Sequence, residues 1–210
     1  MDGVLIDSEP LHISVESNML IELNIPLKKE MYSRFAGTTS ISMWRTLANE
    51  FKLEKSPEEL SVESNRRFIK ELLNSDKVQP FDGVSDLLFN LTKKRIPLAL
   101  ASSSSREVVD SIIDKFDLRQ YFKVIVSGSD VQHSKPHPEI FLIASKKLEI
   151  SPSYCIVVED SPNGVKAAHL AGMGCIGFES GKNHPDISEA KWIIKSFRDF
   201  DYGLLTPPTP

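Results

Sequence analysis

The sequence lacks any apolar run near the roughly 20 residues that a membrane-spanning helix needs, and no signal peptide is expected. It also lacks a basic excess: 25 lysines and arginines against 29 aspartates and glutamates give a net charge of −4, which argues against nucleic acid as a main partner. Cysteine occurs only at Cys155 and Cys175, both in apolar runs, which favours buried free thiols over a disulfide. These absences predict a cytoplasmic protein with neither membrane nor nucleic-acid partners.

The composition that remains is that of an ordinary globular protein, with 40% hydrophobic and 26% charged residues. Apolar residues recur at helical spacing in 108–116, 140–148 and 165–171, between short runs that are hydrophobic almost throughout. Such runs are typical of strands covered on both faces. They are Ile96–Ala101, Val124–Ser127, Cys155–Glu159, Gly174–Phe178 and Trp192–Ile194. Strand alternating with helix predicts an α/β fold with a doubly wound, parallel, Rossmann-like sheet.

The stretch from Leu11 to Val78 has a different pattern, with helical spacing throughout and no convincing strand. A turn at Pro80-Phe81-Asp82-Gly83 separates it from the alternating part. We therefore expect an α/β core built from residues 1–12 and 80–205, with an all-helical cap inserted over 13–79. The proline-rich residues 206–210 are expected to form a disordered tail.

Polar residues follow several of the predicted strands, at the point where each strand ends. Ser102 to Ser105 follow one run, Glu159 and Asp160 end and follow another, and Lys135 lies on the loop after Val124–Ser127. The carboxyl ends of parallel strands share one edge, where ligands of open α/β sheets bind. The sequence therefore predicts that two acidic clusters, a lysine and a hydroxyl-rich turn converge there, with Asp2 among them.

Each of these residues also has a purely structural interpretation. The serines fit a loop that ends in a helix N-cap at Ser105. Glu159 and Asp160 fit turn or cap chemistry before Pro162-Asn163-Gly164, and a lone lysine such as Lys135 is most often solvated. His12, near the start of the first helix, fits a packed or capping role. No single residue decides between these interpretations, but the order of the motifs does.

That order is similar to the four motifs of the haloacid dehalogenase superfamily. The matching residues are Asp2-Gly3-Val4 with Asp7-Ser8-Glu9-Pro10, then Ser102, then Ser134-Lys135-Pro136, then Glu159-Asp160-Ser161 with Gly164. Within the superfamily the chain resembles the phosphatase and β-phosphoglucomutase-like branch, which carries a helical cap after the first strand. The resemblance spans nearly the whole chain, and Asp2 favours phosphate-ester chemistry over carbon–halogen cleavage.

The resemblance implies a role for each motif. Asp2 would act as the general acid and base, and its main-chain carbonyl would bind Mg2+ together with Glu159 and Asp160. Ser102, with the backbone N–H groups around Ser103 and Ser104, would hold phosphoryl oxygens at a helix N-terminus. Lys135 would offset the charge of the carboxylates and the phosphoryl group. The implied reaction is transfer of a phosphoryl group through an aspartyl-phosphate.

The attacking aspartate of this family stands two positions before the acid/base aspartate and closes a central strand. Met1 stands one position before Asp2, so the resemblance puts both the nucleophile and that strand ahead of Met1. We expect the chain as given to be impaired, through a misassigned start or a gene fragment. Selection for inactivity would more simply replace the one aspartate than remove a central strand.

The cap residues bear on the substrate, which is expected to be a small phosphorylated metabolite. In the β-phosphoglucomutase pattern an arginine follows a Gly-Val-Ser turn; the matching region here is 36–40, where the arginine position holds Ser40. Gly37 and Thr38 of that region, and His12, are candidate substrate contacts. A missing cationic fork favours a phosphatase on a sugar phosphate, although Arg45, Arg66 or Arg67 could substitute in a mutase. A non-catalytic binding protein is the third alternative, and a monomer is weakly favoured.

Overall fold

The computed structural model describes residues 1–26, 34–35, 38–76, 78–181 and 186–205. All five predicted strands form, some a little shorter than the apolar runs. They are β1 (Ala99–Ala101), β2 (Val124–Val126), β3 (Ile156–Glu159), β4 (Gly174–Phe178) and β5 (Trp192–Ile194). Every pairing among them is parallel, β1 with β2 in one sheet and β3-β4-β5 in the other. The predicted α/β class with a parallel sheet is confirmed.

The strands lie between two hydrophobic clusters because their side chains alternate between the two faces. Leu100 of β1 packs in the cluster that contains Val109 and Ile112, whereas Val124 and Val126 of β2 pack in the second cluster with Phe141. The helices of the first face are α5 (Val84–Lys93) and α6 (Arg106–Lys115). Those of the second are α7 (Glu139–Leu148), on β1 and β2, and α8 (Pro162–Leu170), on β3 and β4. Helices therefore cover both faces, as a doubly wound sheet requires.

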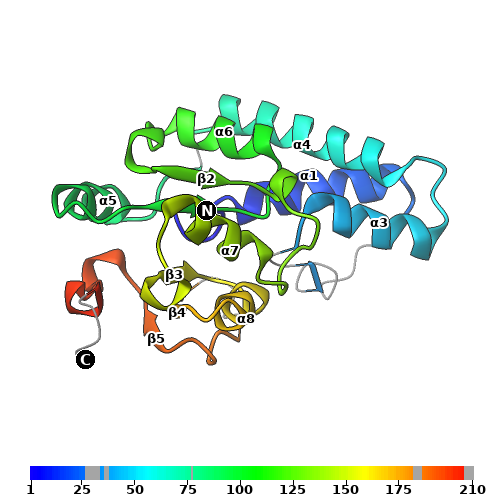
Figure 1. Ribbon diagram of the computed structural model, residues 1–210. Coiled ribbons are helices and arrows are strands. Elements are labelled where there is room, and N and C mark those ends of the chain that lie inside the picture. Colours follow the sequence, from blue (N-terminus) through cyan, green and yellow to red (C-terminus); the bar gives the residue numbers. More distant parts are fainter. Residues whose placement is uncertain (27–33, 36–37, 77, 182–185, 206–210) are drawn as a thin grey trace.

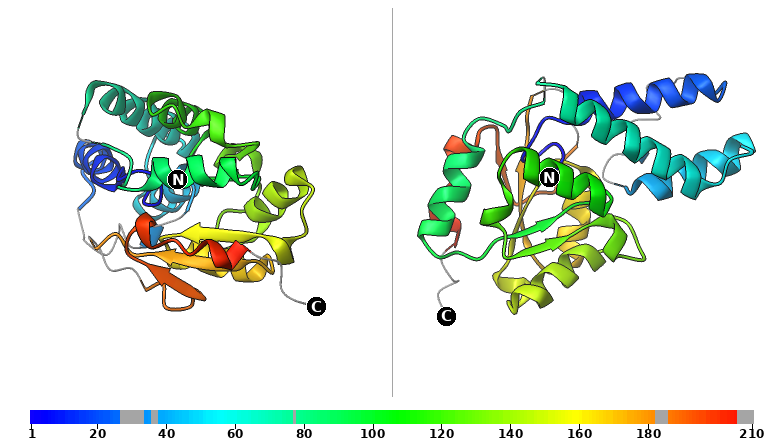
Figure 2. Two further views of the ribbon diagram at one scale, coloured as in Figure 1. Left: turned by 90° about the vertical axis from the view of Figure 1, so that its left-hand side faces the viewer. Right: turned by 90° about the horizontal axis from the view of Figure 1, so that it is seen from above.

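The helices that the described residues form before α5 include α1 (Glu9–Glu22), α3 (Ser40–Phe51) and α4 (Pro57–Asn74). They lie side by side at one side of the core, at the upper right in Figure 1 and projecting from it in the right-hand view of Figure 2. The structure describes no strand between them. The helical insert follows from the sequence pattern, and its bounds at 13 and 79 stay a prediction.

Helix α4 shows how the sequence fixes these elements. Ser56 caps it: the Ser56 hydroxyl accepts a hydrogen bond from the Glu59 N–H, and the Glu59 carboxylate accepts one from the Ser56 N–H. Pro57 occupies the first turn, where its missing N–H is not needed. Leu60, Phe68 and Leu72, spaced for one helical face, are buried. The helical spacing predicted for this stretch thus gives α4 a buried apolar face.

Met1 and Asp2 lie between the two sheets. The Asp2 side chain contacts Ser102 just beyond β1, and the Met1 amine interacts electrostatically with Glu159 at the end of β3. Within the described residues no strand pairing joins β1 to β3. Cys175 is a buried free thiol as expected, whereas Cys155 is only half-buried. No helix in the described part of the chain has the length and apolar character needed to cross a membrane.

Candidate active site at the strand ends

A cavity of about 670 Å3 lies between the helices α1, α3 and α4 and the carboxyl ends of the strands. Its volume is in the range of small-molecule sites. It is lined by nine of the residues that the sequence singles out: Asp2, His12, Thr38, Ser102, Ser103, Ser104, Lys135, Glu159 and Asp160. Gly37 lies outside the described residues, as does the tail 206–210. The expected convergence on one edge of the sheet is thus observed.

The Asp2 carboxylate is held by hydroxyl groups from two directions. Ser8 Oγ donates to Asp2 Oδ1 at 2.6 Å, and Ser104 Oγ donates to Asp2 Oδ2 at 2.8 Å. Ser102 Oγ adds a longer contact of 3.4 Å to Asp2 Oδ2 and accepts from the Ser104 N–H at 3.2 Å. Asp2 is therefore fixed by α1 on one side and by the serine turn after β1 on the other.

His12 is the fourth partner of Asp2, with its Nε2 3.3 Å from Asp2 Oδ1. Its ring stacks on Phe68 of α4, with centroids 4.1 Å apart. Burial alone would raise the pKa of Asp2, but the hydrogen bond and charge of His12 outweigh it and hold that pKa below its usual range. Burial would likewise lower the pKa of His12, yet the Asp2 carboxylate raises it. The described state is thus an ionised aspartate beside an imidazole that keeps its proton more readily than usual.

Replacing Asp2 with asparagine is expected to lower the pKa of His12, because burial persists while the carboxylate charge is lost. The titration of the His12 ring by NMR measures this, with the exposed His169 as internal reference. The raised pKa of His12 also makes stability depend on pH. Its contribution to the free energy of unfolding is fully present below the pKa of histidine in the unfolded chain, about 6.5, and is lost as pH rises through the pKa of His12 in the folded protein. An unchanged His12 titration in Asp2→Asn would contradict the pairing.

Lys135 and Glu159 form a buried ion pair, each with only 6% of its surface exposed. Lys135 Nζ donates to Glu159 Oε1 and lies 4.8 Å from the centroid of the Phe141 ring. Glu159 Oε2 accepts from Ser161 Oγ at 3.0 Å and from the Asp160 N–H at 3.1 Å. Burial would raise the pKa of Glu159, but Lys135 holds it below its ordinary value. Lys135 is therefore not the solvated lysine of the structural interpretation.

Asp160 lies next to this pair without a lysine of its own. Burial first, and then the neighbouring Glu159 charge, raise the pKa of Asp160 to about 7. The backbone of Gly3 packs against it: a Cβ at position 3, where φ is +68°, would fall 1.9 Å from Asp160 Oδ2. Gly3 is thus required both by its left-handed backbone and by the approach of Asp160.

Gly164 has the same relation to Glu159, because a Cβ there would lie 2.0 to 2.3 Å from the three carboxyl atoms. We expect Gly164→Ala to lower the free energy of unfolding by about 1–3 kcal/mol, since Glu159 must leave its pocket. The gain in helix propensity at this position, roughly 0.5–1 kcal/mol, opposes only part of that loss. Urea unfolding measures the difference. Gly174→Ala is the matched control because its Cβ would meet nothing closer than 3.4 Å, and an equal loss there would contradict the explanation.

The cavity is also lined by residues that the sequence did not single out. Glu16 lies one helical turn after His12 on the same face of α1. Asn65 and Asp186 also line the cavity. The i, i+4 spacing of His12 and Glu16 could have indicated Glu16, whereas Asp186 has no local sequence feature that points to the cavity.

The arginines considered for a second phosphate lie elsewhere. Arg67 donates two hydrogen bonds to Glu22, at 2.7 and 2.8 Å, and one to Glu63. Arg66 also binds Glu63, and Arg45 lies 3.6 Å from Glu58. Of the described residues that line the cavity, Lys135 is the one lysine or arginine. None of the three arginines forms a second cationic centre in it.

Comparison with known proteins decides the family. The model of the haloacid dehalogenase-like hydrolases matches residues 1–178. The chain belongs to this family. It is 32% identical over 176 residues to a phosphorylated carbohydrates phosphatase of Thermotoga maritima, covering 82% of this chain and 79% of that protein.

Solved structures show the same fold. A haloacid dehalogenase-family hydrolase of Entamoeba histolytica superposes with a TM-score of 0.84 at 28% identity, over 98% of this chain and 94% of the other. A β-phosphoglucomutase of Clostridium difficile gives a TM-score of 0.84 at 20% identity, over 96% and 91%. This family member is an enzyme of the hydrolase type, related to phosphatases and similar in fold to β-phosphoglucomutase.

Proposed function

We propose that the site supports Mg2+-dependent hydrolysis of a small phosphorylated metabolite, with a sugar phosphate as substrate, through an aspartyl-phosphate. The observation that carries the proposal is the meeting of Asp2, the serine turn and the Lys135–Glu159 pair on one cavity wall. Ser102 and the backbone around Ser103 and Ser104 precede the N-terminus of α6, where a phosphoryl group is favoured. Lys135 supplies the positive charge beside it.

The donor set on this wall fits Mg2+. Glu159 is buried, the adjacent Asp160 is half-buried, and the two share a single lysine; desolvation first, and then the Glu159 charge, raise the pKa of Asp160. Hard carboxylate oxygens are what Mg2+ binds, and the resemblance adds the main-chain carbonyl of Asp2. When bound, Mg2+ would neutralise charge on the phosphoryl oxygens.

The resemblance puts the attacking carboxylate of this mechanism two positions before Asp2. The Met1 amine is buried among Asp2, Lys135, Glu159 and Asp160, and burial lowers its pKa. This supports the expectation that a residue joined to Met1 would lie beside the phosphoryl position, between β1 and β3. Asp2 itself is engaged by Ser8, His12 and the serine turn on the acid/base side.

The test compares two polypeptides, the 210-residue chain and the same chain extended by about five apolar residues ending in aspartate, so that it reads Asp-Met-Asp. We expect only the extended form to release phosphate from p-nitrophenyl phosphate, and only with Mg2+. Comparable turnover by both forms would contradict the assignment of the nucleophile. Phosphate binding without turnover in the extended form would favour the non-catalytic alternative.

A mutase is the second candidate, supported by the shared fold alone. The cavity wall formed by the cap argues for the phosphatase, because its described residues are apolar or carry hydroxyl, amide or carboxyl groups. A bisphosphate would need a second cation there. Phosphate release from hexose monophosphates, compared with isomerisation primed by a bisphosphate, separates the two activities.

A further inference from the structure

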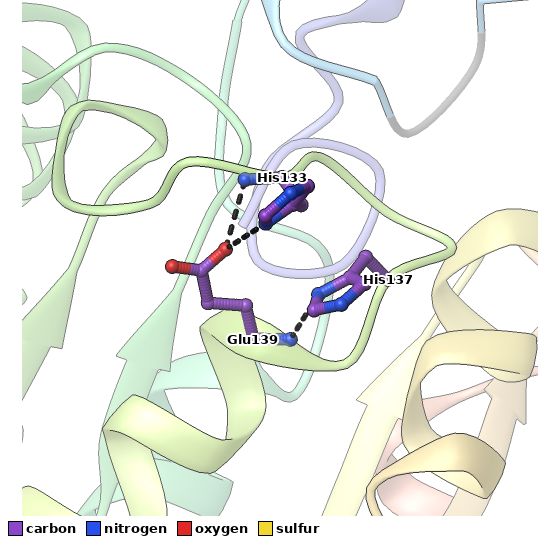
Figure 3. A group of neighbouring side chains, drawn as sticks. All are labelled: His133, His137 and Glu139. Carbon is purple, nitrogen blue, oxygen red and sulfur yellow. Dashed lines mark hydrogen bonds and ion pairs between the residues drawn. The ribbon is translucent and has the colours of Figure 1, made fainter.

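The loop that carries Lys135 holds a second group of polar side chains, outside the cavity. Figure 3 shows His133, His137 and Glu139 grouped at the start of α7, with the Glu139 carboxylate beside the His133 ring and the Glu139 backbone N–H beside the His137 ring. One potential ligand atom from each lies within 4.8 Å of those of the other two. Among the described residues, these three form the one group of histidine, cysteine or carboxylate side chains whose potential ligand atoms lie this close together.

Glu139 is fixed in this group by the backbone. Its carboxylate accepts hydrogen bonds from the His133 N–H at 2.8 Å and from the Gln132 N–H at 3.2 Å, as well as contacting His133 Nδ1 at 3.1 Å. These backbone donors hold the pKa of Glu139 below its ordinary value. An ionised carboxylate thus lies against the His133 ring, and its Oε1, which accepts from the Gln132 N–H at 3.2 Å, keeps a lone pair for another partner.

The His137 ring lies beside that of His133, with centroids 4.6 Å apart and planes inclined by 33°. The hydrogen bond of its ring is long: Nδ1 accepts from the Glu139 N–H at 3.3 Å. Both rings are exposed, so they can rotate without disturbing the core. Pro136 and Pro138 flank His137 and restrict its backbone, which keeps the two rings close.

We propose that His133, His137 and Glu139 bind a single Zn2+ ion, with water completing its coordination. Two imidazoles and one carboxylate form a typical zinc set with an open position, whereas Mg2+ and Ca2+ prefer oxygen ligands. Bonds of about 2.0–2.1 Å put tetrahedral ligand atoms roughly 3.3 Å apart, so the group must close by about 1.5 Å. Rotation of the exposed rings and the end of the Glu139 side chain supplies that movement.

This site has different ligands from the proposed Mg2+ site at Glu159 and Asp160, and it lies outside the cavity. It is therefore a proposal separate from the proposed hydrolysis. Lys135 lies midway between the two histidines in sequence, on the same loop. Zn2+ bound to both histidines therefore ties together the two ends of the segment that positions Lys135. Because a ligand that binds only the folded state stabilises it, Zn2+ should raise the midpoint of thermal unfolding.

The experiment is a calorimetric titration of the 210-residue chain with Zn2+ in millimolar Mg2+, which keeps the oxygen-rich wall of the cavity occupied. We expect one saturable site, and an affinity at least 100-fold lower in His133→Ala/His137→Ala. Glu139→Gln, whose amide oxygen still accepts the backbone N–H bonds, should weaken binding at least tenfold. His169→Ala, which removes an exposed imidazole from α8, should bind like the unmodified chain.

Two further readouts keep the result clear. Circular dichroism checks that each variant is folded, and the Zn2+-dependent rise of the unfolding midpoint should vanish in the double variant alone. Absence of saturable binding by the unmodified chain would overturn the proposal, as would equal affinity in the double variant. Because no readout depends on turnover, failure here leaves the proposed hydrolysis untouched.

Discussion

Replacing Lys135 with methionine should lower the free energy of unfolding of the 210-residue chain by about 3–5 kcal/mol. Methionine fills most of the space of the lysine stem, but it leaves Glu159 as a buried carboxylate beside Asp160, with the Met1 amine, whose pKa burial lowers, as its remaining cationic neighbour. An uncompensated buried charge costs far more than the net value of the pair itself. Urea unfolding followed by circular dichroism at neutral pH measures the change.

A second ion pair in the same chain provides the control. Lys195 contacts Glu179 at 3.2 Å, but 76% of the Lys195 side chain is exposed. Lys195→Met should therefore change stability by no more than about 1 kcal/mol. Adding Glu159→Gln to Lys135→Met should recover part of the loss, since the stranded charge is then gone. Equal effects of the two lysine replacements would show that the Lys135 pair is solvated.

Asp2→Asn, made in the extended polypeptide, should reduce kcat by about 10²–10⁴-fold, the usual contribution of a positioned acid/base group. The asparagine oxygen can still accept from one of the two serine hydroxyls, Ser8 or Ser104, and its amide can donate to the other, so the fold should persist. It cannot take or give a proton. Phosphate release under saturating p-nitrophenyl phosphate and Mg2+ measures the effect.

The ionisation state of Asp2 bears on its two proposed roles, as base and as acid. Its lowered pKa keeps Asp2 in the ionised form that the base half of the reaction requires, in which water loses a proton. For the acid half, the proton held by His12 at 3.3 Å is the nearest described source. Asp82→Asn is the control, because Asp82 pairs with Arg198 at the surface and lines no part of the cavity. A loss in Asp82→Asn as large as in Asp2→Asn would point to a general defect.

Much of the fold could be predicted because its elements carry strong local patterns. The continuous apolar runs predict β1 to β5, and Ser105 caps α6 as expected, accepting from the Val108 N–H at 3.4 Å. The convergence of Asp2, Ser102 and Lys135 was also predictable, because parallel strands deliver their carboxyl ends to one edge. The interpretation of Lys135 as a solvated lysine was wrong because burial depends on tertiary packing, which the local sequence does not show.

The contacts that could not be predicted from the sequence are those that depend on how the folded chain brings distant residues together. Ser8 binds Asp2 because a tight turn returns the chain to α1, with the Gly3 N–H donating to the Ile6 carbonyl at 2.9 Å. His12 stacks on Phe68, a residue 56 positions later in the sequence, and this contact forms only when α1 and α4 pack against each other. No repeating pattern in the sequence relates such residues to the ones that they contact.

The charge lining the cavity has a consequence for how fast a phosphate ester can arrive. The described lining contains one lysine, Lys135, and seven carboxyl residues: Asp2, Asp7, Glu9, Glu16, Glu159, Asp160 and Asp186. Without a divalent cation, such a field repels a dianion during its diffusional approach. Added salt screens that repulsion over about 10 Å at 0.1 M, so association should become faster as ionic strength rises. Divalent cation should reverse this dependence, which makes the salt slope of the association rate a measure of the charge that a ligand meets on its way in.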